Sequence, residues 1–240
     1  MENLNLKCTG MQFNVFFNPV TNIRERAIEL EGEFKNIIPA GFTILPEIGS
    51  MVPLEVPRIL GSDSEGRYRL SLSPVVANIE QIKIDKDISL KEAVLGFQSR
   101  CFDLYSIVTK LTPEILFCGI TIGLEFSPDS DAVELLKNNF VKLNTTKDLY
   151  DFGVKYTFVE DGKYYVNLSI SNLRDQVLNS TAISLQLDIN DRYRFNTYNS
   201  SDLKNENDKH SESDVLQTLI SICEDIIDNK IGDLLKNGVY

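Results

Sequence analysis

The sequence has no tryptophan and one histidine, and its four cysteines include no C-x-x-C pair. A Cys/His zinc site therefore has too few suitably spaced ligands, and we predict no metal site. We expect four free thiols, as in a reducing cytosol. These thiols are Cys8, Cys101, Cys118 and Cys223.

Secretion and membrane signals are also missing. The first residues lack the basic segment and apolar stretch of a signal peptide. The longest apolar run, Ile115 to Leu124, is far shorter than the roughly 20 residues of a membrane-spanning helix. We therefore expect a cytoplasmic protein that does not insert into membranes.

Positive charge is scarce: 24 Lys and Arg face 35 Asp and Glu, which gives a net charge of −11. Nucleic-acid affinity depends on neutralising phosphates with Lys and Arg. We therefore expect no direct nucleic-acid binding. The composition is otherwise that of an ordinary globular protein, with 42% hydrophobic residues.

Common catalytic and cofactor motifs are absent too. Neither standard nucleotide-binding glycine loop occurs. Gly119 and Gly123 lie inside a predicted strand, where they favour close packing over phosphate binding. His210 lies in a very polar stretch that offers no rigid neighbour to fix its tautomer. We predict no catalytic residue and no cofactor.

Alternation of apolar and polar residues predicts strands with one buried face. Gly10 breaks the alternation of the first strand and predicts a bulge. Asp161-Gly162 predicts a hairpin turn. The alternating segments are 4–17, 68–72, 116–126, 152–158, 164–170 and 183–189.

Apolar residues at helical spacing predict helices over 23–37, 90–108, 131–143 and 215–234. Asn22 with Glu25, and Ser89 with Glu92, have the spacing of capping boxes. One-sided strands combined with such helices predict an α+β fold, an antiparallel sheet with helices packed on one face.

We expect the elements to form a single compact domain, 1–240, and their order suggests two loosely similar β-α-β-β-(β)-α halves, 1–112 and 113–240. Arg67-Tyr68-Arg69 and Arg192-Tyr193-Arg194 are a short echo between the halves. The polar segment 196–212 is predicted to be a mobile loop.

The layout resembles a broad family of uncharacterised bacterial α+β proteins of about this length. The similarity lies in the proline-broken segment Pro46–Pro57, the central strand Ile115–Phe126 after a long helix, and the strand Leu185–Ile189 before a closing helix. That family has no settled activity, so the resemblance implies no catalytic residues.

The best local argument for a ligand is a set of arginines that gather if their strands are neighbours: Arg67, Arg69, Arg192 and Arg194. They suggest a module that binds a small anion. Solvated arginines paired with surplus acids are the simpler interpretation.

Carboxylates offer a third possibility, a metal-assisted enzyme. Asp129 and Asp131 flank a predicted helix start, where capping explains them. Asp188 and Asp191 lie on and just after a strand and are expected to face solvent. A hard-metal site requires carboxylates from several segments, which the sequence alone does not bring together.

The closing helix has an apolar stripe wider than one sheet face needs. Its second edge, with Leu216, Ile220 and Ile227, must pack on helix 90–110 or on another chain. The absence of catalytic motifs and the acidic surface favour a non-catalytic interaction protein. We expect it to bind a protein partner or to form a homodimer. Such proteins include adaptors, antitoxin-like or immunity-like partners, and subunits of bacterial defence or assembly systems.

Overall fold

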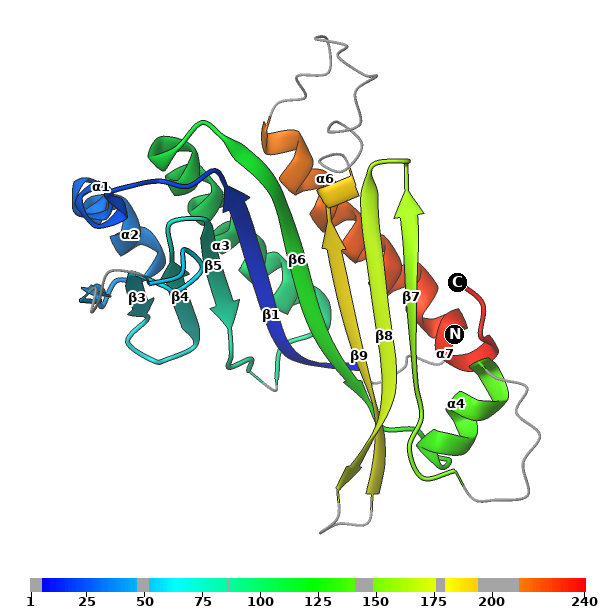
Figure 1. The fold of residues 1–240 in the computed structure, drawn as a ribbon. Coiled ribbons are helices and arrows are strands. Elements are labelled where there is room, and N and C mark those ends of the chain that lie inside the picture. Colours follow the sequence, from blue (N-terminus) through cyan, green and yellow to red (C-terminus); the bar gives the residue numbers. More distant parts are fainter. Residues whose placement is uncertain (1–5, 47–51, 86, 141–148, 176–179, 194–211) are drawn as a thin grey trace.

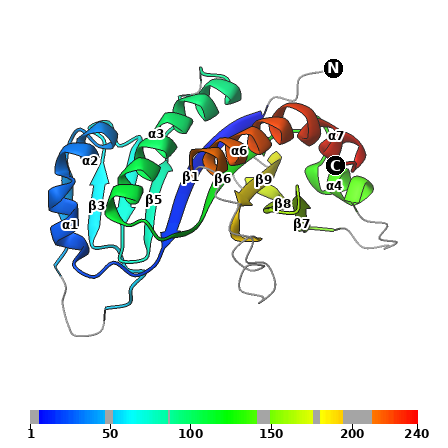
Figure 2. The same cartoon turned by 90° about the horizontal axis from the view of Figure 1, so that it is seen from above.

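The structure is a computed structural model, and it describes residues 6–46, 52–85, 87–140, 149–175, 180–193 and 212–240. A nine-stranded antiparallel sheet has the order β2-β3-β4-β5-β1-β6-β9-β8-β7 (Figure 1). The described helices cover one face of this sheet, and none of them lies against the other face (Figure 2). We call this other side the open face. The predicted α+β architecture is therefore confirmed.

The first half of the chain forms five strands and the helices that cover them. Its strands are β1 (Leu6–Phe17), β2 (Phe42–Ile44), β3 (Ile59–Ser62), β4 (Tyr68–Leu72) and β5 (Val76–Gln81). Its helices are α1 (Ile23–Glu29), α2 (Glu31–Ile37) and α3 (Leu90–Leu111). Ser89 begins α3 with a complete capping box, as predicted, because its side chain and that of Glu92 each accept the other's backbone N–H.

The second half supplies four strands and a second set of helices. Its strands are β6 (Ile115–Phe126), β7 (Gly153–Glu160), β8 (Tyr164–Asp175) and β9 (Ser180–Asn190). Its helices are α4 (Ala132–Phe140), α6 (Glu212–Asp225) and α7 (Ile231–Asn237), with a π-helical turn η1 (Ile226–Lys230) between the last two. The predicted loop 196–212 falls outside the described residues except for Glu212, which begins α6.

Strands in the two halves follow the same order outward from a shared seam. β1 and β6 pair at the centre, from Leu6 opposite Phe126 to Phe17 opposite Ile115. Outward from β1 lie β5, β4 and β3, and outward from β6 lie β9, β8 and β7. The Arg-Tyr-Arg echo does not occupy equivalent places, because Arg67 precedes β4 whereas Arg192 follows β9.

The core fills the space between the sheet and the helices. Alternate side chains of every long strand enter it, including Phe13 of β1, Ile120 of β6 and Leu187 of β9. The helices contribute residues such as Phe97 of α3 and Leu219 of α6. The predicted bulge is present, as the β1–β6 register shifts between Cys8 and Gly10.

Two local predictions were wrong. The helix expected over 23–37 is divided at Leu30 into α1 and α2. Asn22 does not cap α1: its backbone is left-handed, with φ of 57°, and its side chain makes no capping hydrogen bond.

Within the described residues, no helix combines the length and the apolar character that a membrane crossing requires.

Candidate binding surface on the open face

A row of polar side chains crosses the open face from β4 to β7. The strand registers place its members opposite one another in the order Arg69, Glu80, Gln12, Thr121, Asp188, Asn167 and Thr157. Each of these side chains points to the open face, because the residues before and after it in its strand point into the core and side chains of a strand alternate between the two faces. Seven strands of different sequence position thus build one polar stripe.

Hydrogen bonds fix much of this stripe on β7, β8 and β9. The Thr157 hydroxyl donates to Asn167 Oδ1 at 2.8 Å, and Asn167 Nδ2 donates to Asp188 Oδ2 at 2.9 Å. Asn190 Nδ2 donates to the same carboxylate oxygen at 3.3 Å. The Asp188 carboxylate is therefore held in place by two neutral amides. No described Lys or Arg forms an ion pair with it.

A second hydrogen-bonded group lies on β5 and β1. Asn14 Oδ1 accepts from Asn78 Nδ2 at 2.9 Å and from Gln12 Nε2 at 3.3 Å. Next to it, the rings of Phe16 and Phe117 stack with their centroids 4.3 Å apart. The Arg192 guanidinium lies 5.5 Å from the centroid of the Phe117 ring.

A hollow of about 460 Å³ lies between these groups. Its lining consists of Asn14, Phe16, Phe117, Gly119, Thr121, Gln186, Asp188, Asn190 and Arg192. Asp188 is opposite Thr121 of β6, whereas Arg192 lies over Phe117, which is four positions, or about 13 Å, further along the same strand. The hollow is therefore dipolar, with a carboxylate towards one end and a guanidinium on an aromatic pair at the other.

Gly119 and Gly123 of β6 both face the open side and allow close contact there. A β-carbon at Gly119 would lie 2.8 Å from Asn190 Cβ and 3.1 Å from the Ile189 carbonyl oxygen. At Gly123 it would lie 2.6 Å from Thr9 Oγ1. These glycines serve close packing, and Gly119 also forms part of the floor of the hollow.

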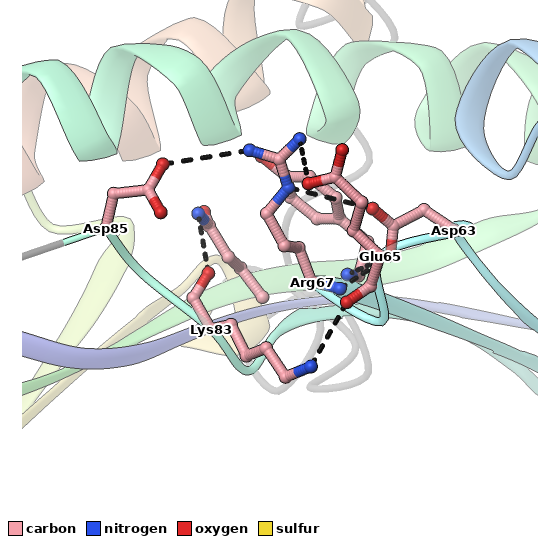
Figure 3. A network of polar contacts seen from close by, with 7 residues as sticks. Asp63, Glu65, Arg67, Lys83 and Asp85 are labelled. Carbon is pink, nitrogen blue, oxygen red and sulfur yellow. Dashed lines mark hydrogen bonds and ion pairs between the residues drawn. The ribbon is translucent and has the colours of Figure 1, made fainter.

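Arg67 and Arg69 are paired with acids of their own half. Arg67 lies among Asp63, Glu65 and Asp85, with the shortest ion pair, 2.7 Å, to Glu65 (Figure 3). Arg69 pairs across the strands with Glu80 at 3.6 Å. The Asp63 carboxylate also accepts the backbone N–H of Arg67 and of Tyr68. This network orders the turn into β4.

The structure does not bring the predicted arginines together. β5, β1 and β6 lie between β4, which carries Arg69, and β9, which precedes Arg192. Arg194 lies outside the described residues, as does His210. Of the predicted anion-binding residues that are described, Arg192 alone lines the hollow.

The two carboxylate pairs have different roles. Asp131 caps α4, because its Oδ1 accepts the backbone N–H of Val133 at 2.9 Å and of Glu134 at 3.1 Å. Asp191 was expected to face solvent, and this was wrong: it is buried and accepts the Cys118 N–H at 2.7 Å. Asp191 thereby pins the end of β9 to β6. Asp188 does lie on the open face.

The described residues contain no group of three or more His, Cys, Asp or Glu placed to hold a metal ion.

Burial raises the pKa of Cys101, Cys118 and Cys223 well above that of a free thiol. Burial also raises the pKa of Cys8, to about 11. The thiols are therefore protonated at neutral pH and are poor nucleophiles.

The apolar stripe of the closing helix is satisfied within the chain. Leu216 and Ile220 are buried in the core, and Ile227 is partly buried against it. α6 packs on α3, β6 and β9. The second edge of the stripe thus meets a helix of the same chain, and Leu216 and Ile220 are not on the surface of the folded protein.

Comparison with known proteins assigns no family. No family model and no curated protein matches the sequence. Among solved structures, the TBP of Methanococcus jannaschii is 13% identical with a TM-score of 0.31, over 92% of this chain and 97% of that chain. A likeness at this level establishes neither a shared fold nor a shared activity.

Proposed function

We propose that the chain is a non-catalytic protein-interaction component that receives a basic side chain of a partner protein in the open-face hollow. The observation that carries the proposal is the Asp188 carboxylate, held by Asn167 and Asn190 without a cation among the described residues. A guanidinium or ammonium supplies that cation.

The lining of the hollow suits such a side chain. Amide and hydroxyl groups of Asn14, Thr121 and Gln186 offer both donors and acceptors around it. Phe16 and Phe117 provide an apolar surface for the aliphatic stem that arginine and lysine bury while their charge stays solvated. Arg192 at the other end favours an acidic group on the same partner.

Charge distinguishes this proposal from a site for small anions. Arg67 and Arg69 are already paired with acids, and Asp188 repels an anion that approaches Arg192 along the hollow. The net charge of −11 likewise favours a basic partner. An adaptor, an antitoxin-like or immunity-like partner, or a subunit of a bacterial defence or assembly system in the cytoplasm fits this role.

A model peptide tests the proposal directly. We expect an extended peptide with arginine and glutamate four positions apart to shift the amide resonances of Thr121, Asp188 and Asn190 on titration. The same peptide with citrulline in place of arginine keeps the shape but has no charge. Its affinity is expected to be lower by at least about tenfold, since a charge-assisted hydrogen bond contributes about 1.5–3 kcal/mol.

Two variants complete the experiment. Asp188→Asn preserves the side-chain shape and is expected to remove the preference for arginine over citrulline. Glu125→Gln removes the same charge from the open face, outside the hollow, and is expected to leave the preference unchanged. Equal binding of the two peptides by the unmodified protein, or an equal loss in both variants, would overturn the proposal.

A further inference from the structure

The two edges of the sheet are built differently. β2 has three residues, with Pro39 before it and Pro46 after it. β7 has eight residues and no proline. Short length and nearby prolines protect a sheet edge from pairing with other chains, and β7 has neither protection. Among the described residues, β8 alone pairs with β7.

The hydrogen-bond pattern shows which backbone groups of β7 point outward. The Phe152 carbonyl accepts the Asn172 N–H at 3.2 Å, and the Glu160 carbonyl accepts the Lys163 N–H at 3.0 Å. Even-numbered residues therefore bond towards β8, and in an antiparallel pair the bonding direction alternates. Lys155, Thr157 and Val159 consequently direct their N–H and C=O groups to the free edge.

Side chains of β7 also separate by face. Val154, Tyr156 and Phe158 lie half-buried on the helix side, where Tyr156 meets Phe140 and Phe158 meets Tyr240. Lys155, Thr157 and Val159 are exposed on the open side, and Val159 exposes 46% of its surface. An added strand would thus find an aromatic surface on one face and Lys155 on the other.

The helices decide what fits beside this edge. α4 and α7 extend past β7 on the helix side in both views (Figures 1 and 2). A second folded copy would bring its own α4 and α7 into the same layer and collide with them. A single extended segment has no such layer and can lie along β7 beneath these helices.

We propose that β7 accepts an extended segment of a partner protein as an additional strand. Its backbone pairs with the outward groups of Lys155, Thr157 and Val159. Its side chains alternate, with apolar residues towards Tyr156 and Phe158 and acidic residues beside Lys155. The proposal is independent of the hollow, because it rests on a sheet edge three strands away from β6.

Amide hydrogen exchange tests the proposal with a synthetic peptide of alternating valine and glutamate. We expect the peptide to slow exchange of the Lys155, Thr157 and Val159 amides by about tenfold or more, because each gains a backbone acceptor. The even-numbered amides, already bonded to β8, are expected to change little. A peptide of the same composition with the alternation scrambled is the control.

Thr157→Pro removes an outward N–H without removing a backbone hydrogen bond to β8. Thr157→Val is its matched control, because it also loses the hydroxyl bond to Asn167 but keeps the N–H. We expect the proline variant to lose at least about tenfold in peptide affinity and the valine variant to retain it. Should the proline variant not fold, Lys155→Glu, which repels the acidic side chains, is expected to weaken binding instead. Slower exchange at none of the three amides, or at even-numbered amides equally, would overturn the proposal. Asp188→Asn should not affect this result.

Discussion

The ring of Tyr240 stacks on the ring of Phe158, with centroids 4.1 Å apart and planes 1° from parallel. The Tyr240 hydroxyl donates to Glu160 Oε1 at 3.1 Å, and Lys230 Nζ donates to the same oxygen at 3.1 Å. The residues after α7 thus fasten the helical layer to β7. Among the described residues, no other aromatic pair joins the residues after α7 to the sheet.

Removal of the Tyr240 ring should therefore destabilise the protein. We expect Tyr240→Ala to lower the free energy of unfolding by about 1–3 kcal/mol, the sum of lost burial and lost ring stacking. Tyr240→Phe keeps the ring and should cost about 1 kcal/mol or less. Urea unfolding of the three proteins measures both values. Equal losses in the two variants would show that the hydroxyl, not the stacking, is what matters.

Gly119 and Gly123 should respond differently to the same substitution. Gly119→Ala places a methyl group against the backbone oxygen of Ile189, which cannot move easily, and we expect a loss of about 1–3 kcal/mol. Gly123→Ala meets the side chain of Thr9, so a Thr9→Ala background should restore most of its loss. Urea unfolding of the double-mutant cycle tests this. A Gly119→Ala protein as stable as the original would contradict the packing argument.

The thiol of Cys8 should show a distinctive pH dependence. Burial raises its pKa from 9.0 to about 11, partly offset by a hydrogen bond with the Gly10 backbone. Because the folded protein holds this proton more tightly, the stabilisation is complete below about pH 9 and is lost as the pH rises through about 11. Stability measured from neutral pH upward should fall more for the original protein than for Cys8→Ser. Parallel curves would contradict the shift.

Of the two predicted capping boxes, the one at Ser89 is present and the one at Asn22 is absent, so substitutions at these two residues should differ in effect. Ser89→Ala should lower the free energy of unfolding by about 1 kcal/mol, because the Glu92 N–H loses its acceptor. Asn22→Gly should cost little or stabilise, since Asn22 makes no capping bond and glycine adopts its left-handed backbone freely. Thermal unfolding distinguishes the two. A large loss for Asn22→Gly would mean that the side chain has a role that its backbone conformation does not reveal.

Local pattern was enough to predict most of the strands and the long helices. The alternation of β6 and β9, the bulge at Gly10 and the Ser89 capping box follow from neighbouring residues alone. β3 shows no period of its own in the sequence, because its four residues after Pro57 are too few. The division at Leu30 was missed because the apolar spacing continues through it.

The candidate site was less accessible to sequence reasoning. Asp188 was correctly predicted to face away from the core, since it alternates with Leu187 and Ile189. Its neighbours depend on β6 lying between β1 and β9, an order set by contacts distant in sequence. The hollow could be predicted from the sequence only by considering together the polar residues that alternate with the buried ones in β1, β6 and β9.

The central seam has a consequence for the order in which the chain gains structure during synthesis. β1 finds its first partner when β5 appears, with Met11 opposite Gln81, and its second only when β6 is complete at Phe126. Those residues are made roughly 45 positions later, a delay of about two to nine seconds at ordinary translation rates. During that interval one full side of β1 has no hydrogen-bonding partner. The strand that joins the two halves is thus also an unpaired edge in the growing chain, and the rate of translation across residues 82–126 sets how long this edge can pair with other chains.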